Sequence, residues 1–280
     1  MTNTLSFDHI STDFASVREE LVGQNGVPAY KLPGTPGGIC VDVGSNVGGF
    51  ASLTCNYFDA IHCIEPSLHC GRQAVRNLQS VGADNIYFYR YAVGANFGDK
   101  VSLYKHKDGD STASTTVPGS GEHSLVGEEV TTISLERIKT DIAKGEYIKY
   151  LKVDCEGSEY DFLYGKDLSK IGWLSLELHN TLSPEKRRKL QKHIEKYFVL
   201  WYGRRSSKPP THLELTYISK EFLAGCAESF RGFVETGALK THEPFFDTDQ
   251  VIGDNDMVRH EPTPILTLIK ELNAENLTIK

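Results

Sequence analysis

The chain has 280 residues, 39% hydrophobic and 24% charged, a composition typical of a globular protein whose core needs no metal or disulfide support. No stretch approaches the ~20 consecutive apolar residues that a membrane-spanning helix needs, and no basic and apolar leader of the secretory type opens the chain. Basic residues number 30 and acidic residues 37, and the net charge of −7 disfavours sequence-independent binding to nucleic acid. We expect a soluble, cytoplasmic protein without a membrane span.

The six cysteines form no C-x-x-C pair and have no zinc-ligand spacing with histidine. Cys40 and Cys63 stand inside apolar runs, where a thiol behaves as a small hydrophobic group. We expect all of the thiols to be reduced, as is usual in a cytosolic protein.

Basic residues cluster once along the chain, and the pattern favours the solvated face of a helix and a loop, although a local contact with nucleic acid stays open. The members of this cluster are Lys186, Arg187, Arg188, Lys189 and Lys192, followed by Arg204, Arg205 and Lys208.

The first part of the chain precedes any regular pattern: residues 14–22 are predicted to form a short helix, and a Gly/Pro-rich connector follows. From residue 39, apolar runs of strand length alternate with stretches of helix length. The elements expected first are strand 39–43, helix 47–57, strand 61–65, helix 67–81 and strand 86–93.

The middle of the chain is less regular. We expect an edge-type strand at 100–104, a loop at 109–121 rich in Ser, Thr and Gly, and a strand at 129–133. Because the loop has few apolar residues to anchor it, we expect it to be mobile and to lie near the active site.

The alternation then resumes with strand 149–153. Ser158 is a good N-cap residue for the helix that follows, with Asp161 three positions later, and Pro184 stands in the first turn of another helix. The remaining expected elements are strand 173–178, helix 184–197 and two strands, 198–202 and 212–218, antiparallel at the sheet edge.

This order of elements predicts an α/β fold, a Rossmann-like doubly wound and mostly parallel sheet with antiparallel edge strands. We divide the chain into an N-terminal helix and connector (1–38), a ligand-binding domain (39–220) and a C-terminal extension packed on it (221–280). Such sheets bind ligands beyond the carboxyl ends of their strands, so the chemistry is expected there.

The first expected strand ends in a glycine-rich turn, VDVGSNVGGF. Gly44, Gly48 and Gly49 lack Cβ atoms, which lets a ligand approach the backbone, and the next helix would point its N-terminus at that ligand. The spacing excludes the nucleotide P-loop, and Asn46 stands where the dinucleotide fingerprint has its second glycine.

An acidic residue, Glu65, ends the second expected strand, 21 residues after Gly44. A carboxylate at this place can accept hydrogen bonds from both hydroxyls of a ribose. Together with the glycine-rich turn it predicts the binding of an adenosyl compound, either a dinucleotide or S-adenosylmethionine.

Carboxylates gather in the segment YLKVDCEGSEYDFL. Asp154 and Glu156 follow a buried strand, where unpaired carboxylates are costly, so they predict a ligand, a metal or a proton-transfer role. Glu159 fits a helix N-terminus. At the end of the next strand, Glu177 and His179 share one face, and a histidine there could transfer protons at neutral pH or merely bind a backbone carbonyl.

The motifs VDVGSNVGGFA, CIEPS, SLERI, KVDCEGSE and LSLELH, from about residue 40 to 179, resemble the FkbM-type methyltransferases. The specific part is KVDCEGSE, close to the family's [KI]-[IV]-D-x-E-G-x-E. The resemblance implies a class I, Rossmann-like sheet that binds S-adenosylmethionine and transfers its methyl group to a hydroxyl, typically of a sugar, glycan or secondary metabolite.

The resemblance also implies roles for single residues. Glu65 would bind the ribose of the cofactor, and Asp154 and Glu156 would face the sulfonium or the acceptor. The residues that would hold the amino-acid portion of the cofactor are Asp42, Gly44, Ser45, Asn46 and Gly48.

For the chemistry, we expect His179 to be the general base, with Asp154 and Glu156 orienting the acceptor and Glu156 the next candidate base. We expect no metal, because two carboxylates are a sparse ligand set, although Mg²⁺ bound through them stays open.

Four alternatives remain: a metal-assisted small-molecule methyltransferase, a nucleic-acid (ribose) methyltransferase, a nicotinamide dehydrogenase and a nucleoside-binding module without turnover. The missing fingerprint glycine disfavours the dehydrogenase, and the acidic net charge disfavours nucleic acid as the partner.

Overall fold

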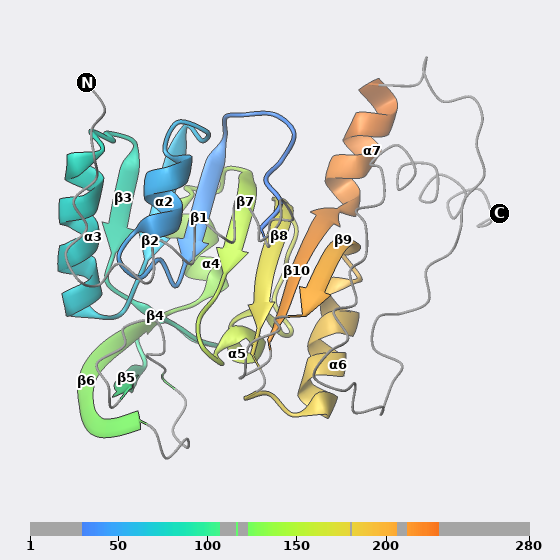
Figure 1. Ribbon diagram of the computed structural model, residues 1–280. Coiled ribbons are helices and arrows are strands. Elements are labelled where there is room, and N and C mark those ends of the chain that lie inside the picture. Colours follow the sequence, from blue (N-terminus) through green and yellow to red (C-terminus); the bar gives the residue numbers. More distant parts are fainter. Residues whose placement is uncertain (1–29, 107–115, 117–122, 180, 206–211, 230–280) are drawn as a thin grey trace.

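The computed structural model describes residues 30–106, 116, 123–179, 181–205 and 212–229. Within this part of the chain, a seven-stranded sheet forms the centre, in the order β3-β2-β1-β7-β8-β10-β9 (Figure 1). Its strands are β1 (Ile39–Val43), β2 (Ala60–Ile64), β3 (Ile86–Tyr89), β7 (Ile148–Val153), β8 (Ile171–Leu178), β9 (Phe198–Arg205) and β10 (Leu213–Ser219).

Neighbouring strands of this sheet run parallel from β3 to β8. Strand β10 runs antiparallel to both β8 and β9, so the reversed strand lies one position inside the edge. The α/β class and the antiparallel end of the sheet, both predicted from the sequence, are confirmed.

The sheet has a hydrophobic core on each face, because successive side chains of a buried strand alternate between the faces. Val41, Val43 and Leu151 belong to one core, and Cys40 and Tyr150 to the other. The first core also contains residues of helix α4 (Leu135–Arg137), π-helix η2 (Ile138–Ile142), α5 (Glu159–Leu163) and α6 (Pro184–Ile194); the second contains residues of α2 (Gly49–Thr54), α3 (Leu68–Ser80) and α7 (Lys220–Ser229).

A second, three-stranded sheet has the order β4-β6-β5 and consists of β4 (Ala92–Val93), β5 (Lys100–His106) and β6 (His123–Ile133). It lies at the end of the molecule toward which the arrows of β1, β7 and β8 point (Figure 1). The prediction of one strand over residues 86–93 is therefore wrong. The chain leaves the main sheet after Tyr89, and Ala92 and Val93 pair with Thr132 and Ile133 instead.

Helix boundaries differ from the prediction where turn geometry intervenes. The helix expected at 47–57 begins only at Gly49 and has six residues, because Gly48 adopts a left-handed conformation (φ +80°). Ser67 and Ser183 cap α3 and α6 through their side chains, and Pro184 occupies the first turn of α6 as predicted. Ser158 precedes α5 without a capping hydrogen bond, and its hydroxyl lies 2.8 Å from that of Thr116.

Several expectations concern parts of the chain outside the described residues. These are the helix at 14–22, the loop at 109–121 apart from Thr116, and the C-terminal residues from 230 onward. Cys40, Cys55, Cys63, Cys70 and Cys155 are free thiols, as expected. On α6, Lys186, Arg188, Lys189 and Lys192 are exposed and Arg187 is half-buried. Among the described residues, no helix is long and apolar enough to cross a membrane.

Candidate active site

The glycine-rich turn after β1 is shaped by the chain itself. The amides of Gly44 and Ser45 both donate to the carbonyl oxygen of Ile64 at the end of β2. Gly44 has φ +75°, and a Cβ on it would overlap the carbonyl oxygen of Asp154; a Cβ on Gly48 would lie 3.3 Å from that of Ala74. These glycines are therefore required by the packing of β1 against β7 and α3, whether or not a ligand approaches them.

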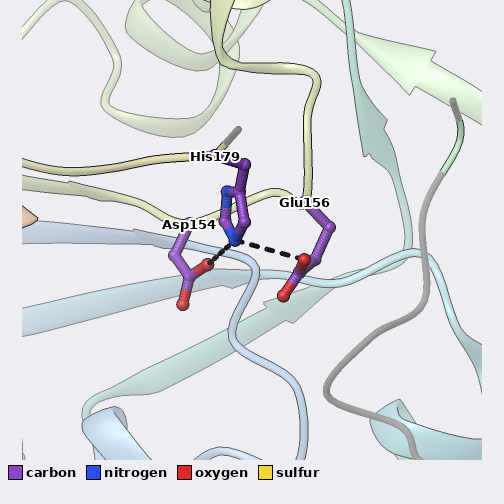
Figure 2. A group of neighbouring side chains, drawn as sticks. All are labelled: Asp154, Glu156 and His179. Carbon is purple, nitrogen blue, oxygen red and sulfur yellow. Dashed lines mark ion pairs between the residues drawn. The ribbon is translucent and has the colours of Figure 1, made fainter. Parts of the chain in front are cut away.

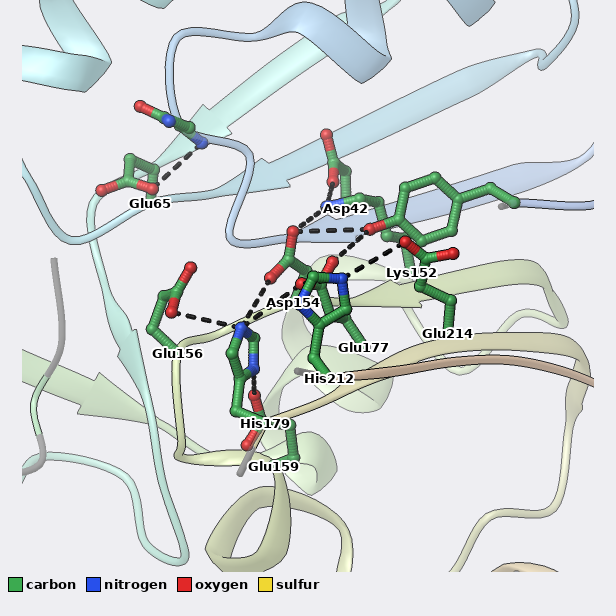
Figure 3. A network of polar contacts seen from close by, with 12 residues as sticks. Asp42, Glu65, Lys152, Asp154, Glu156, Glu159, Glu177, His179, His212 and Glu214 are labelled. Carbon is green, nitrogen blue, oxygen red and sulfur yellow. Dashed lines mark hydrogen bonds and ion pairs between the residues drawn. The ribbon is translucent and has the colours of Figure 1, made fainter. Parts of the chain in front are cut away.

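Glu65, directly after β2, stabilises this turn by accepting backbone hydrogen bonds. One carboxylate oxygen accepts the amide of Asn46 at 3.0 Å and the other accepts the amide of Ser67 at 2.8 Å, and the residue is only 7% exposed. Asn46 adopts φ +47°, which asparagine tolerates better than most residues. Glu65 thus holds a fixed negative charge beside the turn (Figure 3).

Polar atoms without hydrogen-bond partners among the described residues mark the same end of β1. They include the buried amide oxygen of Asn46, whereas the hydroxyl of Ser45 interacts with the thiol of Cys63. Buried polar atoms ordinarily have a partner, so the oxygen of Asn46 fits a site that a polar ligand completes.

A buried lysine links this end of β1 to the end of β7. Asp42 and Lys152 are register partners in the parallel pair of strands, 0% and 2% exposed, and Nζ of Lys152 lies 3.6 Å from Asp42 and 3.2 Å from Asp154. Burial raises the pKa of Asp42 despite the lysine. Burial also acts to raise the pKa of Asp154, but Lys152 and His179 outweigh it and hold that pKa below its usual range.

His179, at the end of β8, lies between carboxylates on both sides of its ring (Figure 2). Its Nδ1 is 2.7 Å from Oε1 of Glu159, and its Nε2 is 3.1 Å from Oε2 of Glu156 and 3.9 Å from Oδ1 of Asp154. Burial alone would lower the pKa of His179, but Glu156 and Glu159 outweigh it and raise that pKa well above its usual value. The structure therefore brings together all three residues that the sequence predicts as catalytic.

Glu156 occupies a backbone conformation that few side chains adopt. Its φ is +53°, and Gly157 follows with φ +110°. A non-glycine residue in the left-handed region stores strain of the kind found at functional sites. The turn directs the Glu156 carboxylate toward His179.

Two further strands and the connector add residues that the sequence analysis does not single out. His212 lies beside the start of β10, with Nε2 3.1 Å from Glu177 and 3.3 Å from Glu214. The hydroxyl of Tyr30 donates to Glu177 at 3.2 Å, and it lies 3.4 Å from Asp154. No local motif marks Tyr30, His212 or Glu214; for Lys152 the signal is a charged residue within an apolar strand.

We divide the residues around the carboxyl ends of these strands into two groups; Figure 3 shows Glu65 apart from the network around Asp154 and His179, which Asp42 joins through Lys152. We call the turn at residues 42–48 together with Glu65 the cofactor half. We call the following set the acceptor half: Asp154, Glu156, Glu159, Glu177, His179, His212 and Glu214. The two halves share one edge of the sheet, because Gly44 packs on the backbone of Asp154.

The sheet order, the reversed β10 and the turn after β1 define the class I, Rossmann-like methyltransferases that use S-adenosylmethionine. Residues 42–207 match the family model described as "Methyltransferase FkbM domain". The chain belongs to the FkbM methyltransferase family, as the sequence motifs indicate.

Solved structures similar to this chain include TrmK of M. capricolum with S-adenosyl-homocysteine, at 10% identity over 77% of this chain and 70% of that chain (TM-score 0.41). Another is the fibrillarin pre-rRNA processing protein of Methanococcus jannaschii, at 10% identity over 68% and 70% of the two chains (TM-score 0.42). None of the curated proteins matches the chain.

Proposed function

We propose that this methyltransferase transfers the methyl group of S-adenosylmethionine to a hydroxyl oxygen of a small-molecule or glycan acceptor. The observation that carries this proposal is the position of His179, between Asp154 and Glu156 and next to the turn after β1. A proton-accepting cluster beside a cofactor turn suits an acceptor atom that must lose a proton during transfer.

The cofactor half supplies the residues that would hold S-adenosylmethionine. Glu65 would bind the ribose hydroxyls, and the residues for the amino-acid portion would be Asp42, Gly44, Ser45, Asn46 and Gly48. The buried amide oxygen of Asn46, which has no partner among the described residues, supports this assignment. The cofactor supplies a methyl group already activated by its positive sulfur.

The acceptor half favours a neutral polyol over a phosphate-rich acceptor. Carboxylates only accept hydrogen bonds, so they pair with the hydroxyl groups that a sugar offers in number. The side chains of Asp154 and Glu156 are 22% and 31% exposed and thus reachable. A nucleic-acid backbone would bring phosphates against these carboxylates, which is unfavourable.

Two side chains are candidates for the proton acceptor. His179 is the base that we proposed from the sequence, but Glu156 and Glu159 raise its pKa well above the usual value, which favours the protonated ring. Burial raises the pKa of Glu156, although His179 opposes it, which makes Glu156 a stronger base than an ordinary carboxylate. His179→Gln and Glu156→Gln, assayed separately for kcat, distinguish the two.

The proposal is tested by calorimetry and by transfer of labelled methyl groups. We expect S-adenosylmethionine to bind and NAD not to bind, and we expect label from the cofactor to enter a panel of neutral glycans and sugars as a methyl ether. The control acceptors are RNA and an amine-rich peptide. Label on nitrogen, label on RNA, or binding of NAD in place of S-adenosylmethionine would contradict the proposal. Binding without any transfer would favour the nucleoside-binding module.

A further inference from the structure

The reactive atoms of Asp154, Glu156 and His179 converge on one small volume (Figure 2). Nε2 of His179 lies 3.1 Å from Oε2 of Glu156 and 3.9 Å from Oδ1 of Asp154. The ligand atoms of the three residues all lie within 4.8 Å of one another. Two atoms that each lie about 2.0–2.2 Å from one cation are roughly 3 to 4 Å apart, depending on the angle between them. The spacing therefore fits three ligands of a single cation after small side-chain rotations.

The imidazole ring of His179 is held from its far side. Glu159 is fully buried, its Oε1 lies 2.7 Å from Nδ1 of His179, and the same oxygen accepts the amide of Gly157 at 3.0 Å. A carboxylate on one ring nitrogen is the arrangement that commonly orients a histidine whose other nitrogen binds a metal. Here it directs Nε2 toward Asp154 and Glu156.

With His179 in this orientation, a positive charge between Nε2 and the carboxylates would be stabilising. When Nδ1–H donates to Glu159, a neutral ring presents its Nε2 lone pair to three carboxylates: Glu156 at 3.1 Å, Glu177 at 3.5 Å and Asp154 at 3.9 Å. Electron-rich groups then face one another. Lys152 lies on the other side of Asp154, with Nζ 3.2 Å from Oδ2. Either a proton on Nε2 or a bound cation can supply this positive charge.

We propose that Oδ1 of Asp154, Oε2 of Glu156 and Nε2 of His179 bind one divalent cation of the transition series, such as Mn²⁺, Fe²⁺ or Zn²⁺. The ligand set decides the class of cation. Mg²⁺ and Ca²⁺ prefer oxygen ligands, whereas an imidazole nitrogen suits the transition metals, and two carboxylates balance the charge of a divalent ion. Sequence analysis counts only two carboxylates here, and the tertiary structure adds the histidine.

A role for this cation rests on the proposed function. Three protein ligands leave coordination positions open, and the partly exposed Asp154 and Glu156 lie where an acceptor can reach them. With Glu156 and His179 as ligands of the cation, neither would be the base. A cation beside the acceptor hydroxyl would lower the pKa of that hydroxyl, and its proton would pass to solvent. The oxygen would then form a bond to the methyl carbon as the bond from that carbon to sulfur breaks, and S-adenosylhomocysteine would leave.

Binding of Mn²⁺ to the full chain, freed of metal by chelation and dialysis, tests the site without any acceptor. Free Mn²⁺ has a strong electron paramagnetic resonance signal, which bound Mn²⁺ largely loses. We expect one Mn²⁺ per chain, displaced by Zn²⁺. We also expect Glu156→Gln and His179→Gln each to weaken binding by tenfold or more, and Glu159→Gln, which touches the ring but not the cation, by about ten- to a hundredfold.

Two control variants separate this site from general attraction to acidic groups. His212→Gln removes a neighbouring imidazole outside the triad, and Asp141→Asn removes an exposed carboxylate paired with Arg137. Both should leave Mn²⁺ affinity within about threefold, because neither residue is a ligand. Weakened binding in Asp141→Asn but not in His179→Gln would overturn the site. So would the absence of stoichiometric Mn²⁺ or Zn²⁺ binding in the folded wild-type chain.

Methyl-transfer assays on the same samples distinguish an incorrect cation site from an incorrect proposed function. Full methyl transfer to a hydroxyl by the chelated protein, together with no Mn²⁺ binding, would remove the cation and leave the O-methyltransferase. Stoichiometric Mn²⁺ binding that depends on His179, with label found only on nitrogen or on RNA, would keep the site and remove the hydroxyl acceptor.

Discussion

The two halves of the candidate active site hold their charges in different ways. In the cofactor half, Glu65 is bound by two backbone amides, and the turn is shaped by glycine conformations. In the acceptor half, the charges are matched mainly by other side chains, with His179 and His212 contacting carboxylates from several elements.

The difference separates a rigid subsite from an adjustable one. Backbone amides are positioned by the fold and cannot change their charge, so the cofactor half keeps its geometry as long as the sheet is intact. Histidines and carboxylates can exchange protons or accept a cation, so the state of the acceptor half depends on what is bound. Four variants test the rigid side of this contrast: the cofactor half and the lysine that links it to Asp154.

The largest effect is expected from Gly44→Ala. A Cβ at this position would overlap the carbonyl oxygen of Asp154, and φ is +75°, so β1 and β7 would have to separate. We expect a loss of more than ~4 kcal/mol in the free energy of unfolding, or no soluble protein. Urea denaturation and soluble yield measure it.

Gly82→Ala is the matched control for this variant. Its φ of +67° is similar, but nothing lies within 4 Å of the added Cβ, so only the conformational penalty of about 1 kcal/mol remains. Equal losses of stability in the two variants would show that the overlap with Asp154 adds nothing to the destabilisation by Gly44→Ala.

Lys152→Met should have the next largest effect, because it leaves the buried carboxylate of Asp42 without its cation. Removing one partner of a buried ion pair typically costs about 3–5 kcal/mol. The variant Asp42→Asn/Lys152→Met should recover part of that loss. A double-mutant cycle measured by denaturation checks the recovery, and strictly additive effects would mean that the two residues are not coupled.

Glu65→Gln removes the carboxylate charge of the cofactor half while keeping the shape of the side chain. The amide has one acceptor oxygen, so either Asn46 or Ser67 loses its partner. We expect the free energy of unfolding to fall by about 1–2 kcal/mol and the Kd for S-adenosylmethionine to rise by about tenfold. Denaturation and calorimetry on the same preparation report both, and unchanged affinity would exclude Glu65 from the ribose site.

Asn46→Gly should have the smallest effect on stability. It removes a side chain whose amide oxygen has no partner among the described residues, and it keeps both the positive φ and the amide that donates to Glu65. Stability should change by less than ~0.5 kcal/mol, while the cofactor Kd should rise by about fivefold for one lost hydrogen bond. A large loss of stability with unchanged cofactor affinity would contradict a binding role.

The comparison also shows which parts of the site can be read from a sequence. The turn at residues 42–48 and the acidic residue after the second strand form a local pattern, because glycine conformations and strand ends are properties of short segments. The order of strands and helices predicts the parallel sheet for the same reason. The break after Tyr89 escaped prediction, since Ala92 and Val93 pair with Thr132 and Ile133, about 40 residues away.

The sequence by itself determined the family, the class of fold and the position of Asp154, Glu156 and His179 at the carboxyl ends of strands. Only the tertiary structure decided what surrounds them: Lys152 between Asp42 and Asp154, and Glu159 behind the ring of His179. The physical reason is that the partner of a charged side chain is set by the order and register of strands that are distant in sequence. The identity of the residue limits which partners would suit it, and the sheet selects which partner it has.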